Sequence, residues 1–304
     1  MAVNHRISIV IVSLNGERRI SWCLKSVLES DWSDLELIVV DNGSTDRTTE
    51  AIKSAAPGAK LIRAEKNLGF AGGNNLGIAE ATGNIIVLLN DDCEPRHDWL
   101  KAWAAAGETL PDWGVMGCKL LYPGSDVIQH AGGLLEPNAL TKHIGYMEHD
   151  RGQYGEVRRC DYVTGAAFAI RREALERVGT LDPEYFPIYF EECDFCFRVA
   201  RAGYGVYYVP AAVVVHHESM TTKRMSYGFL CKYQRNRLRF IIKNFDGPRL
   251  RRAIRREIGW LVRDRPWDCL LPLARAYIYA LLHASALSRA RRENQRSQSP
   301  QFRL

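Results

Sequence analysis

The sequence predicts an α/β fold in which a mostly parallel sheet carries helices on both faces. Apolar strand-like runs alternate with amphipathic helical segments through the first 90 residues, and glycines or polar residues follow these runs. Hydrophobic residues make up 46% of the 304 residues, which is enough for a substantial core. In open sheets of this kind ligands bind beyond the carboxyl ends of the strands, so the residues there are the first candidates for a site.

The elements of the N-terminal part follow from their own patterns. Strands are predicted where apolar, mostly β-branched residues run together, and helices where apolar residues recur at helical spacing. The expected order is a strand at 7–13, a helix at 18–30, a strand at 35–41, a helix at 45–55, a strand at 59–64, a glycine-rich turn opening a helix at 69–82, and a strand at 84–90.

The pattern is looser in the second half. Residues 122–160 are rich in Gly, His and Pro and predict loops with short elements. After them we expect a strand and helix at 162–179, a helix from the stretch "FEECDFCFR" (190–198) to about Gly203, strands at "GVYYVP" and "AVVVHH", basic amphipathic helices from about 227, and disorder in the final "RRENQRSQSPQFRL".

Charge divides the chain into an acidic body and a basic tail. Residues 1–217 hold 21 Lys and Arg against 29 Asp and Glu, whereas residues 218–304 hold 20 against 6. Together with the basic helical pattern from about 227, this division predicts a main domain at 1–226, with halves at 1–120 and 121–226, and a basic helical extension with a disordered end at 227–304. A basic tail indicates an anionic partner such as a lipid surface, a nucleic acid or a charged substrate.

The apolar segments favour a cytoplasmic protein. The first run, Ile7 to Val12, is too short for the core of a signal peptide, and no segment reaches the roughly 18 uncharged apolar residues of a spanning helix. The eight cysteines show no framework spacing, so we expect free thiols. Cys193 and Cys196 form a C-x-x-C without a second pair at zinc spacing, which argues against a zinc site.

Three polar segments follow predicted strands or open a helix. In "VVDNGSTD", Asp41 ends a strand and could accept hydrogen bonds from a nucleotide, but a turn with a helix cap gives the same pattern. "NLGFAGGNNLG" (67–77) suits close approach to a phosphate or a purely structural turn, because its spacing matches neither common phosphate-binding motif. In "LLNDDCEP", two acids follow a buried strand, which favours a divalent cation over a solvated loop.

Two further stretches carry titratable groups. His216 and His217 end a strand whose alternation points their rings to opposite faces, so at most one is expected to face a site. In the helix from residue 190, we expect Cys193 and Cys196 on the core face, together with Phe190, Phe197 and Ala200. Glu191 should then point almost opposite to that face, toward solvent or another segment, and Asp194 should pair with Arg198 one turn on. Glu192 has no such partner.

The segments together resemble inverting family-two glycosyltransferases of the GT-A, Rossmann-like fold, particularly their rhamnosyltransferase-like bacterial branch. The resemblance covers roughly residues 6 to 245. It rests on six segments in order: "ISIVIVSLNG", "VVDNGSTD", "NLGFAGGNNLGI", "LLNDDCEP", the long run from "VTGAAFAIRREALERVG" through "FEECDFCFRVARAGYG" to "AVVVHH", and "RNRLRFIIKN".

The resemblance implies a role for each matching position. Glu192 would be the general base, where the family often has Asp, and Asp92 and His216 would hold Mg²⁺ or Mn²⁺, with Asn90 at the first position of the family's D-x-D motif. Gly165, Glu191, Asp194 and Arg235 would lie on the acceptor side. The nucleotide site would comprise Ser13, Leu14, Asn15, Asp41, Gly43, Asn67, Gly69, Gly72, Asn74 and Asp91.

The implied partners are a nucleoside diphosphate sugar donor, with dTDP-rhamnose or a UDP-sugar expected, and a glycan or lipid-linked acceptor in cell-envelope polysaccharide synthesis. Residues 1–120 would bind the donor and 121–226 the acceptor. We expect no nucleic-acid partner. A sugar-phosphate nucleotidyltransferase is the alternative enzyme, although "SLNGERR" lacks its G-x-G-T-R-type loop. A non-catalytic protein that binds anionic surfaces through its basic tail is the other.

The tail carries a hypothesis of its own. Aromatic residues alternate with arginines at Trp260, Trp267, Tyr277 and Tyr279, and leucines recur at 270, 271 and 273. A basic amphipathic surface of this kind suits peripheral contact with the anionic inner face of the cell membrane. A helical lid or dimer element packed on the body would give the same pattern, so both interpretations stay open.

Overall fold

The computed structural model describes residues 6–217, 226–264 and 269–297. The chain forms two compact units, described separately below. Unit 1 consists of Met1–Gly133, His143–Pro187 and Glu191–Glu218, and unit 2 of Leu134–Lys142, Ile188–Phe190 and Ser219–Leu304. Two short segments, 134–142 and 188–190, therefore group with the C-terminal helices, which neither composition nor charge indicates.

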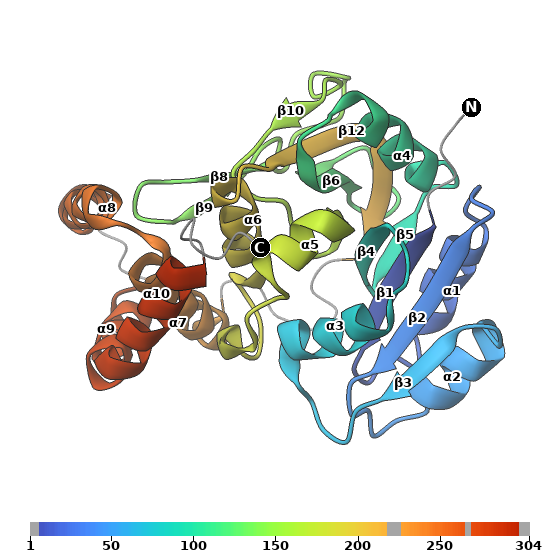
Figure 1. Cartoon of the computed structure of the whole chain (residues 1–304), viewed down its shortest axis with the longest axis horizontal. Coiled ribbons are helices and arrows are strands. Elements are labelled where there is room, and N and C mark those ends of the chain that lie inside the picture. Colours follow the sequence, from blue (N-terminus) through green and yellow to red (C-terminus); the bar gives the residue numbers. More distant parts are fainter. Residues whose placement is uncertain (1–5, 218–225, 265–268, 298–304) are drawn as a thin grey trace. The chain divides into compact units, whose positions relative to one another are not determined.

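Unit 1 is built on one sheet whose strand order is β10-β12-β6-β11-β4-β1-β2-β3, with β5 paired to β12 and β7 to β6 (Figure 1). Its path is parallel except at β11, which runs antiparallel to β4 and β6, and at β10. The strands are β1 (Ile7–Ser13), β2 (Leu35–Asp41), β3 (Lys60–Arg63), β4 (Ile85–Asn90), β5 (Cys93–Pro95), β6 (Trp113–Leu121), β7 (Ile128–His130), β10 (Arg158–Arg159), β11 (Ala167–Arg171) and β12 (Gly205–His216). The predicted fold class is confirmed.

Helices cover both faces of this sheet. On one face of the sheet, Ile9 and Ile11 of β1 share a core with residues of α1, α2 and α4, among them Trp99. On the other face, Val10 of β1 contacts Gly77 of α3. The absence of a side chain at Gly77 lets α3 pack closely on the sheet. The helices are α1 (Ile20–Leu28), α2 (Thr48–Ala55), α3 (Gly69–Glu80), α4 (Trp99–Thr109), α5 (Arg172–Val178) and α6 (Glu191–Arg201), with a 3₁₀ turn at Pro183–Tyr185.

Three parts of unit 1 differ from the predicted elements. The glycine-rich segment is helical from Gly69 itself, and the two strands expected after Gly203 are one strand, β12, with an irregularity between Val209 and Val213. Helix α4 and the central strand β6 were not predicted. Strand β6 carries Gly114 and Gly117, which is atypical of a strand, but each glycine lies where another side chain packs tightly against the backbone.

Unit 2 consists mainly of helices. It also contains most of a two-stranded sheet in which β8 (Gly133–Leu135) pairs with β9 (Thr141–His143). Its interior is held by Arg237, whose guanidinium is fully buried and donates to Glu257 and to the Asn138 carbonyl. The helical elements are α7 (Tyr227–Asn244), α8 (Gly247–Gly259), a π-helical turn (Trp260–Asp264), α9 (Leu270–Leu282) and α10 (Ala284–Ser297).

The end of the chain differs from its prediction. Disorder was expected from residue 291, but α10 continues to Ser297, and residues 298–304 lie outside the described part, as does Trp267. Within the described residues, none of the helices alone has the length and apolar character needed to cross a membrane. The pair Leu270–Leu282 and Ala284–Asn294, bent by 76°, meets these criteria only when taken together.

Candidate active site

The carboxyl ends of five strands meet at one edge of the sheet. Because β1, β2, β4, β6 and β12 all run in the same direction, their carboxyl ends lie at the same edge. Ser13 at the end of β1 pairs with Asp41, and Asn90 at the end of β4 pairs with Val12 of β1. The antiparallel strand β11 starts at the same edge, where the Asn90 amide donates to the Ala166 carbonyl at 2.8 Å. Gly165 therefore lies beside the end of β4.

The loops after β1 and β2 are tied to each other. Asn15 adopts a left-handed backbone (φ 51°), its side-chain oxygen accepts from the Thr45 amide at 2.9 Å, and its own amide donates to Ser44. The Leu14 carbonyl accepts from Arg19 at 2.8 Å. These contacts fix the backbone of the segment that sequence analysis assigned to the nucleotide.

Asp41 is buried and already engaged. It accepts from the Ser44 amide at 2.9 Å and from the Thr49 hydroxyl, and Arg63 lies 3.6 Å away. Burial alone would raise the pKa of Asp41, but these hydrogen bonds outweigh it and leave the pKa below its usual value. The turn-and-cap interpretation of this residue is therefore realised, and its contact with a nucleobase remains a prediction.

The glycine-rich segment is held against the loop after β2. Gly43 has φ 82°, and a side chain there would collide with the backbone of Lys66 and Asn67. The Asn42 side chain donates to Asn67 and to the Gly69 carbonyl and accepts from the Leu68 amide. In α3, a side chain at Gly72 would meet Leu68 one turn earlier, and buried Asn74 donates to the Phe70 carbonyl. The contact of these two residues with a nucleotide remains a prediction.

The two acids after β4 have different environments. Asp91 is paired with Arg19 at 2.9 Å and accepts from the Ser13 hydroxyl, so its carboxylate is bound within the protein. In Asp92, the buried oxygen Oδ1 has no hydrogen-bond partner among the described residues. The Nε2 atom of His216 lies 3.3 Å from this oxygen. The structure thus brings together the two residues expected to hold a metal.

Gln129, which sequence analysis did not single out, determines the protonation of His216. Its amide nitrogen donates to the His216 carbonyl at 2.7 Å, so its oxygen is the atom 2.8 Å from His216 Nδ1. Nδ1 must then carry the proton, and in the neutral ring Nε2 presents a lone pair. Two acceptors, Nε2 and Asp92 Oδ1, therefore face each other in a buried place, an arrangement that fits a cation between them.

Cys93 completes the cluster of groups that could reach such a cation, with ligand atoms within 4.8 Å of one another. Burial raises the pKa of the Cys93 thiol well above its usual value, and the thiol donates to the Ala166 carbonyl at 3.4 Å. A protonated thiol is a poor metal ligand. The donor set is therefore one carboxylate and one imidazole. It leaves room for phosphate oxygens around a divalent cation, and the carboxylate is a ligand that Mg²⁺ and Mn²⁺ prefer.

Helix α6 brings Glu192 to the same edge. Val199, near the C-terminal end of α6, packs on Gly114 at the start of β6, and the Cys196 thiol accepts from the Val163 amide, beside Gly117. The helix therefore runs antiparallel to β6, and its first turn, which holds Glu192, lies toward the carboxyl end of that strand.

The Glu192 carboxylate is poised to exchange a proton near neutral pH. Its side chain is partly accessible to solvent, but desolvation by the surrounding protein raises its pKa to about 7, and hydrogen bonds from its own amide and from Cys193 offset this only in part. Its carboxylate accepts a weak hydrogen bond from the Cys193 thiol at 3.8 Å.

The neighbouring acids correct the expected orientation of this helix. Of the two expected directions for Glu191, solvent is wrong, because the residue is 1% exposed and is therefore covered by other parts of the chain. Ala200, expected in the core, is exposed. Asp194 pairs with Arg198 at 2.9 Å as predicted and also accepts from Tyr185. The buried face of α6 is wider than its apolar residues alone suggested, because the Asp194–Arg198 ion pair is also buried on it. Of the predicted acceptor-side residues, Arg235 lies in unit 2, over the Tyr279 ring.

The sequence profile of glycosyl transferase family 2 matches residues 8–179, more than half of the chain. The chain belongs to glycosyl transferase family 2. The match includes the loops after β1, β2 and β4 and ends before Glu192 and His216, so these two residues are placed by geometry alone.

Two relatives and a solved structure resemble the chain over most of its length. A protein from Sinorhizobium fredii is 31% identical over 70% of this chain, which spans only 24% of that longer protein. The N-acetylglucosaminyl-diphospho-decaprenol L-rhamnosyltransferase of Mycobacterium tuberculosis is 27% identical over 70% of this chain and 76% of its own length. The solved mannosyltransferase of Pyrobaculum calidifontis, in complex with GDP-Man and Mn²⁺, is 20% identical, covers 96% of this chain and 84% of its own, and has a TM-score of 0.60. The predicted family and GT-A fold are confirmed.

Removing the Gln129 side-chain amide should weaken metal binding without unfolding the protein. In Gln129→Leu the His216 ring loses the acceptor that fixes its tautomer, so we expect a 10- to 100-fold loss of Mn²⁺ affinity in a calorimetric titration. Gln129→Glu keeps an acceptor for Nδ1 and should retain more of the affinity. Equal affinity in the wild type and Gln129→Leu would show that this contact does not orient a ligand.

Proposed function

We propose that the chain is a metal-dependent, inverting glycosyltransferase that moves a sugar from a nucleoside diphosphate sugar to a glycan or lipid-linked acceptor in cell-envelope polysaccharide synthesis. The proposal rests on the Asp92–His216 pair, 3.3 Å apart, and on the first turn of α6, which carries Glu192 and lies toward the carboxyl end of β6. Binding beyond the carboxyl ends of strands is the rule for open α/β sheets.

Asp92 and His216 fit a divalent cation, and the unpaired Asp92 Oδ1 opposite a bare imidazole nitrogen supports this. A bound Mg²⁺ or Mn²⁺ would offset the negative charge that develops on the departing diphosphate. Mn²⁺ accompanies GDP-Man in the Pyrobaculum mannosyltransferase, which supports a cation of this class without choosing between the two metals.

Glu192 supplies the base that the acceptor needs. A sugar hydroxyl is a weak nucleophile, and a carboxylate within hydrogen-bond reach can take its proton as the oxygen attacks the anomeric carbon. The new carbon–oxygen bond forms as the bond to the diphosphate oxygen breaks, and the nucleoside diphosphate leaves with that electron pair. A single displacement of this kind inverts the anomeric centre.

The donor and acceptor are proposed from chemistry shared with relatives. The Mycobacterium relative is named for rhamnosyl transfer to a decaprenol-linked sugar, which supports dTDP-rhamnose as the first donor to test and a lipid-linked acceptor. UDP-sugars are the second choice. The tied loops at Asn15 and Asp41 provide a fixed backbone to which a nucleotide could bind.

A donor screen tests the function directly. The melting temperature of the purified protein is measured with dTDP-rhamnose, UDP-glucose, UDP-galactose and UDP-N-acetylglucosamine, each in the presence of Mg²⁺ or Mn²⁺ and without metal. We expect one donor to raise the melting temperature only in the presence of metal, and the same donor to be consumed with an acceptor. If no nucleotide sugar shifts the melting curve at millimolar concentration, the proposal is wrong.

The basic helices of unit 2 are proposed to contact an anionic membrane surface, which would place the enzyme at the inner face of the membrane. In α8 and the turn after it, Ile254, Ile258 and Val262 follow one another at four-residue spacing and are 52%, 57% and 66% exposed. Arg251 and Arg255 are exposed beside them. An apolar row flanked by arginines suits anionic lipid headgroups.

A single charge in that row should release the protein from vesicles. We expect the wild type to sediment with vesicles containing phosphatidylglycerol and not with phosphatidylcholine alone, and Ile258→Glu to lose at least half of this binding. Leu28→Glu is the matched control, because Leu28 is 52% exposed on α1 of unit 1. Undiminished sedimentation of Ile258→Glu would rule out this surface.

A further inference from the structure

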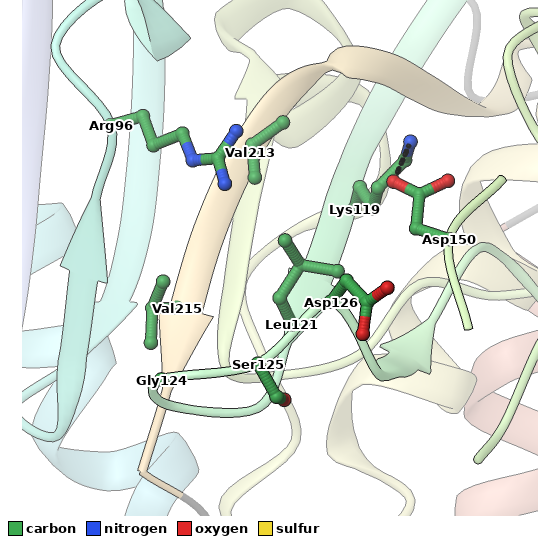
Figure 2. Close-up of a pocket in the computed structure, with 9 residues that line it drawn as sticks. All are labelled: Arg96, Lys119, Leu121, Gly124, Ser125, Asp126, Asp150, Val213 and Val215. Carbon is green, nitrogen blue, oxygen red and sulfur yellow. Dashed lines mark hydrogen bonds and ion pairs between the residues drawn. The ribbon is translucent and has the colours of Figure 1, made fainter. Parts of the chain in front are cut away.

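A polar pocket of about 680 Å³ lies in unit 1, at the ends of β6 and β12. Figure 2 shows Arg96, which follows β5, and Lys119 of β6 projecting into it around the apolar side chains of Val213 and Val215. The volume is within the range of about 300–1,000 Å³ found for small-molecule sites. Leu121, Gly124, Ser125, Asp126 and Asp150 complete the lining.

The pocket is separate from the Asp92–His216 pair. Side chains alternate along a strand, and Val214, between the two pocket valines, packs into the main core instead. By the same alternation His216 belongs to the face of Val214. A ligand in the pocket would therefore lie across β12 from the proposed metal, close to the site but not in the place of the donor.

Lys119 carries unused hydrogen-bond donors. The residue is only 8% exposed, and its ammonium makes one hydrogen bond within the described part of the chain, to Asp150 at 2.7 Å. An ammonium has three N–H groups, and a buried charged group is costly unless its donors are satisfied. Two donors are therefore left for whatever occupies the pocket.

Arg96 adds a free cation. Its guanidinium is exposed and makes no hydrogen bond or ion pair with any described residue, although its backbone is fixed by a bond to the Val213 carbonyl at 3.0 Å. A guanidinium offers five N–H groups in a planar fork that matches a carboxylate or phosphate.

The acids of the pocket are partly committed elsewhere. Asp150 accepts from Lys119 and from the Gly152 amide, and Asp126 lies 2.7 Å from His149 at the exposed rim. The Ser125 hydroxyl donates to the Tyr122 carbonyl. The free N–H groups of Arg96 and Lys119 are available to an oxyanion, and the remaining lone pairs of Asp126 and Asp150 could accept from hydroxyl groups.

We propose that this pocket binds an oxyanion, a carboxylate or a phosphate, carried by a sugar, with Arg96 and Lys119 as its ligands. Its size exceeds that of a lone phosphate, and Asp126 at the rim suits the hydroxyl groups of the attached sugar. The assignment of this sugar to the acceptor rests on the proposed glycosyl transfer, and it makes that acceptor acidic. The oxyanion site itself does not depend on the reaction.

Direct titration tests the site. D-glucuronate, inorganic phosphate and neutral D-glucose are titrated into the full chain and followed by calorimetry. We expect glucuronate or phosphate to bind saturably at low millimolar concentration or tighter, and glucose not to bind. Tighter binding of glucuronate assigns the group as a sugar carboxylate, and tighter binding of phosphate assigns it as a phosphate. No saturable binding of either anion overturns the proposal.

Two variants locate the binding and one serves as control. Arg96→Gln, at an exposed position that should not affect folding, is expected to weaken anion binding at least tenfold, and Lys119→Gln similarly if it folds. Arg177→Gln removes an exposed arginine of α5 outside the pocket and should change nothing. Unchanged binding in Arg96→Gln excludes this pocket. Parallel titrations with dTDP and with UDP, each with Mn²⁺, separate the two proposals, because a wild type that binds neither nucleotide would refute only the transferase site.

Discussion

Glu192→Gln is expected to reduce sugar transfer by roughly 10²- to 10⁴-fold, the usual contribution of a general base. Glutamine has nearly the same shape as the wild-type side chain but cannot accept the proton of the acceptor hydroxyl. Donor binding should change little, since the substitution lies on α6 and not in the loops that follow β1 and β2. The measurement is kcat and KM for the donor identified in the screen.

The same residue should set the pH dependence of the reaction. Burial raises the pKa of Glu192 to about 7, so the carboxylate is protonated and inactive below that pH and ionised above it. We expect kcat/KM to rise about tenfold per pH unit below 7 and to level off above it. A profile that stays flat between pH 5.5 and 8 would exclude Glu192 as the base, even if the variant were inactive.

The pH dependence of the stability of the folded protein is a second test of the raised pKa of Glu192. The pKa of Glu192 is higher in the folded protein than the ordinary value of 4.5, so the stability it contributes is fully present below pH 4.5 and is lost as the pH rises through 7. At pH 8 the wild type therefore carries a destabilising charge, on the order of 3 kcal/mol at most, that Glu192→Gln lacks.

The variant should consequently melt several degrees above the wild type at pH 8 and close to it at pH 4.5. Glu176→Gln, at an exposed acid of α5, is the matched control and should alter neither the activity nor the melting temperature. A less stable Glu192→Gln protein at pH 8 would mean that the carboxylate contributes to folding rather than to the site.

The sequence could predict the features of the site that depend on short segments. Ser13, Asp41 and Asn90 end apolar runs that form parallel strands for local reasons, so their meeting at one edge follows from the fold class. Asp92 and His216 are 124 positions apart in the sequence, so only the family resemblance predicted that they would meet. In the structure, Cys93 of β5 pairs with His216 of β12, and this pairing brings Asp92 next to His216.

Other features depend on packing that no local pattern records. Gln129 lies in a segment that reads as a loop, and only its two bonds to His216 show its importance. Glu191 is buried because the surrounding chain encloses it, although its position on the helix was equally compatible with exposure. Strand β6 contradicts strand propensity at Gly114 and Gly117, where α6 and Val163 need the space.

A further tertiary feature lies just before helix α6, which carries Glu192. Tyr189 and Phe190 both have left-handed backbones, with φ of 88° and 76°, which costs on the order of 1–3 kcal/mol each. The Asn236 side chain donates to the carbonyls of Ile188 and Tyr189 at 3.1 and 2.9 Å and so holds this turn within unit 2. The turn ends directly before α6, and its backbone therefore determines where the helix that carries Glu192 begins.

Asp92→Asn is expected to abolish the stabilisation of the protein by Mn²⁺. A cation that binds only the folded state raises the free energy of unfolding by about 2.7 kcal/mol when its concentration is a hundred times Kd. Asparagine removes the charge, and its amide can donate to the lone pair on His216 Nε2, which lies 3.3 Å from Asp92 Oδ1. The introduced amide therefore occupies the place of the cation and satisfies the two facing acceptors internally.

This substitution thus has opposite effects with and without metal. In the presence of a chelator, Asp92→Asn should be at least as stable as the wild type, because a buried carboxylate oxygen without a partner has been replaced. With millimolar Mn²⁺ the wild type should gain several degrees in melting temperature and the variant none, and sugar transfer should fall by at least 10²-fold. Asp98→Asn, an exposed acid near the start of α4, controls for non-specific binding. An equal response of Asp92→Asn and the wild type to Mn²⁺ would place the metal elsewhere and remove the basis for assigning His216 as its ligand.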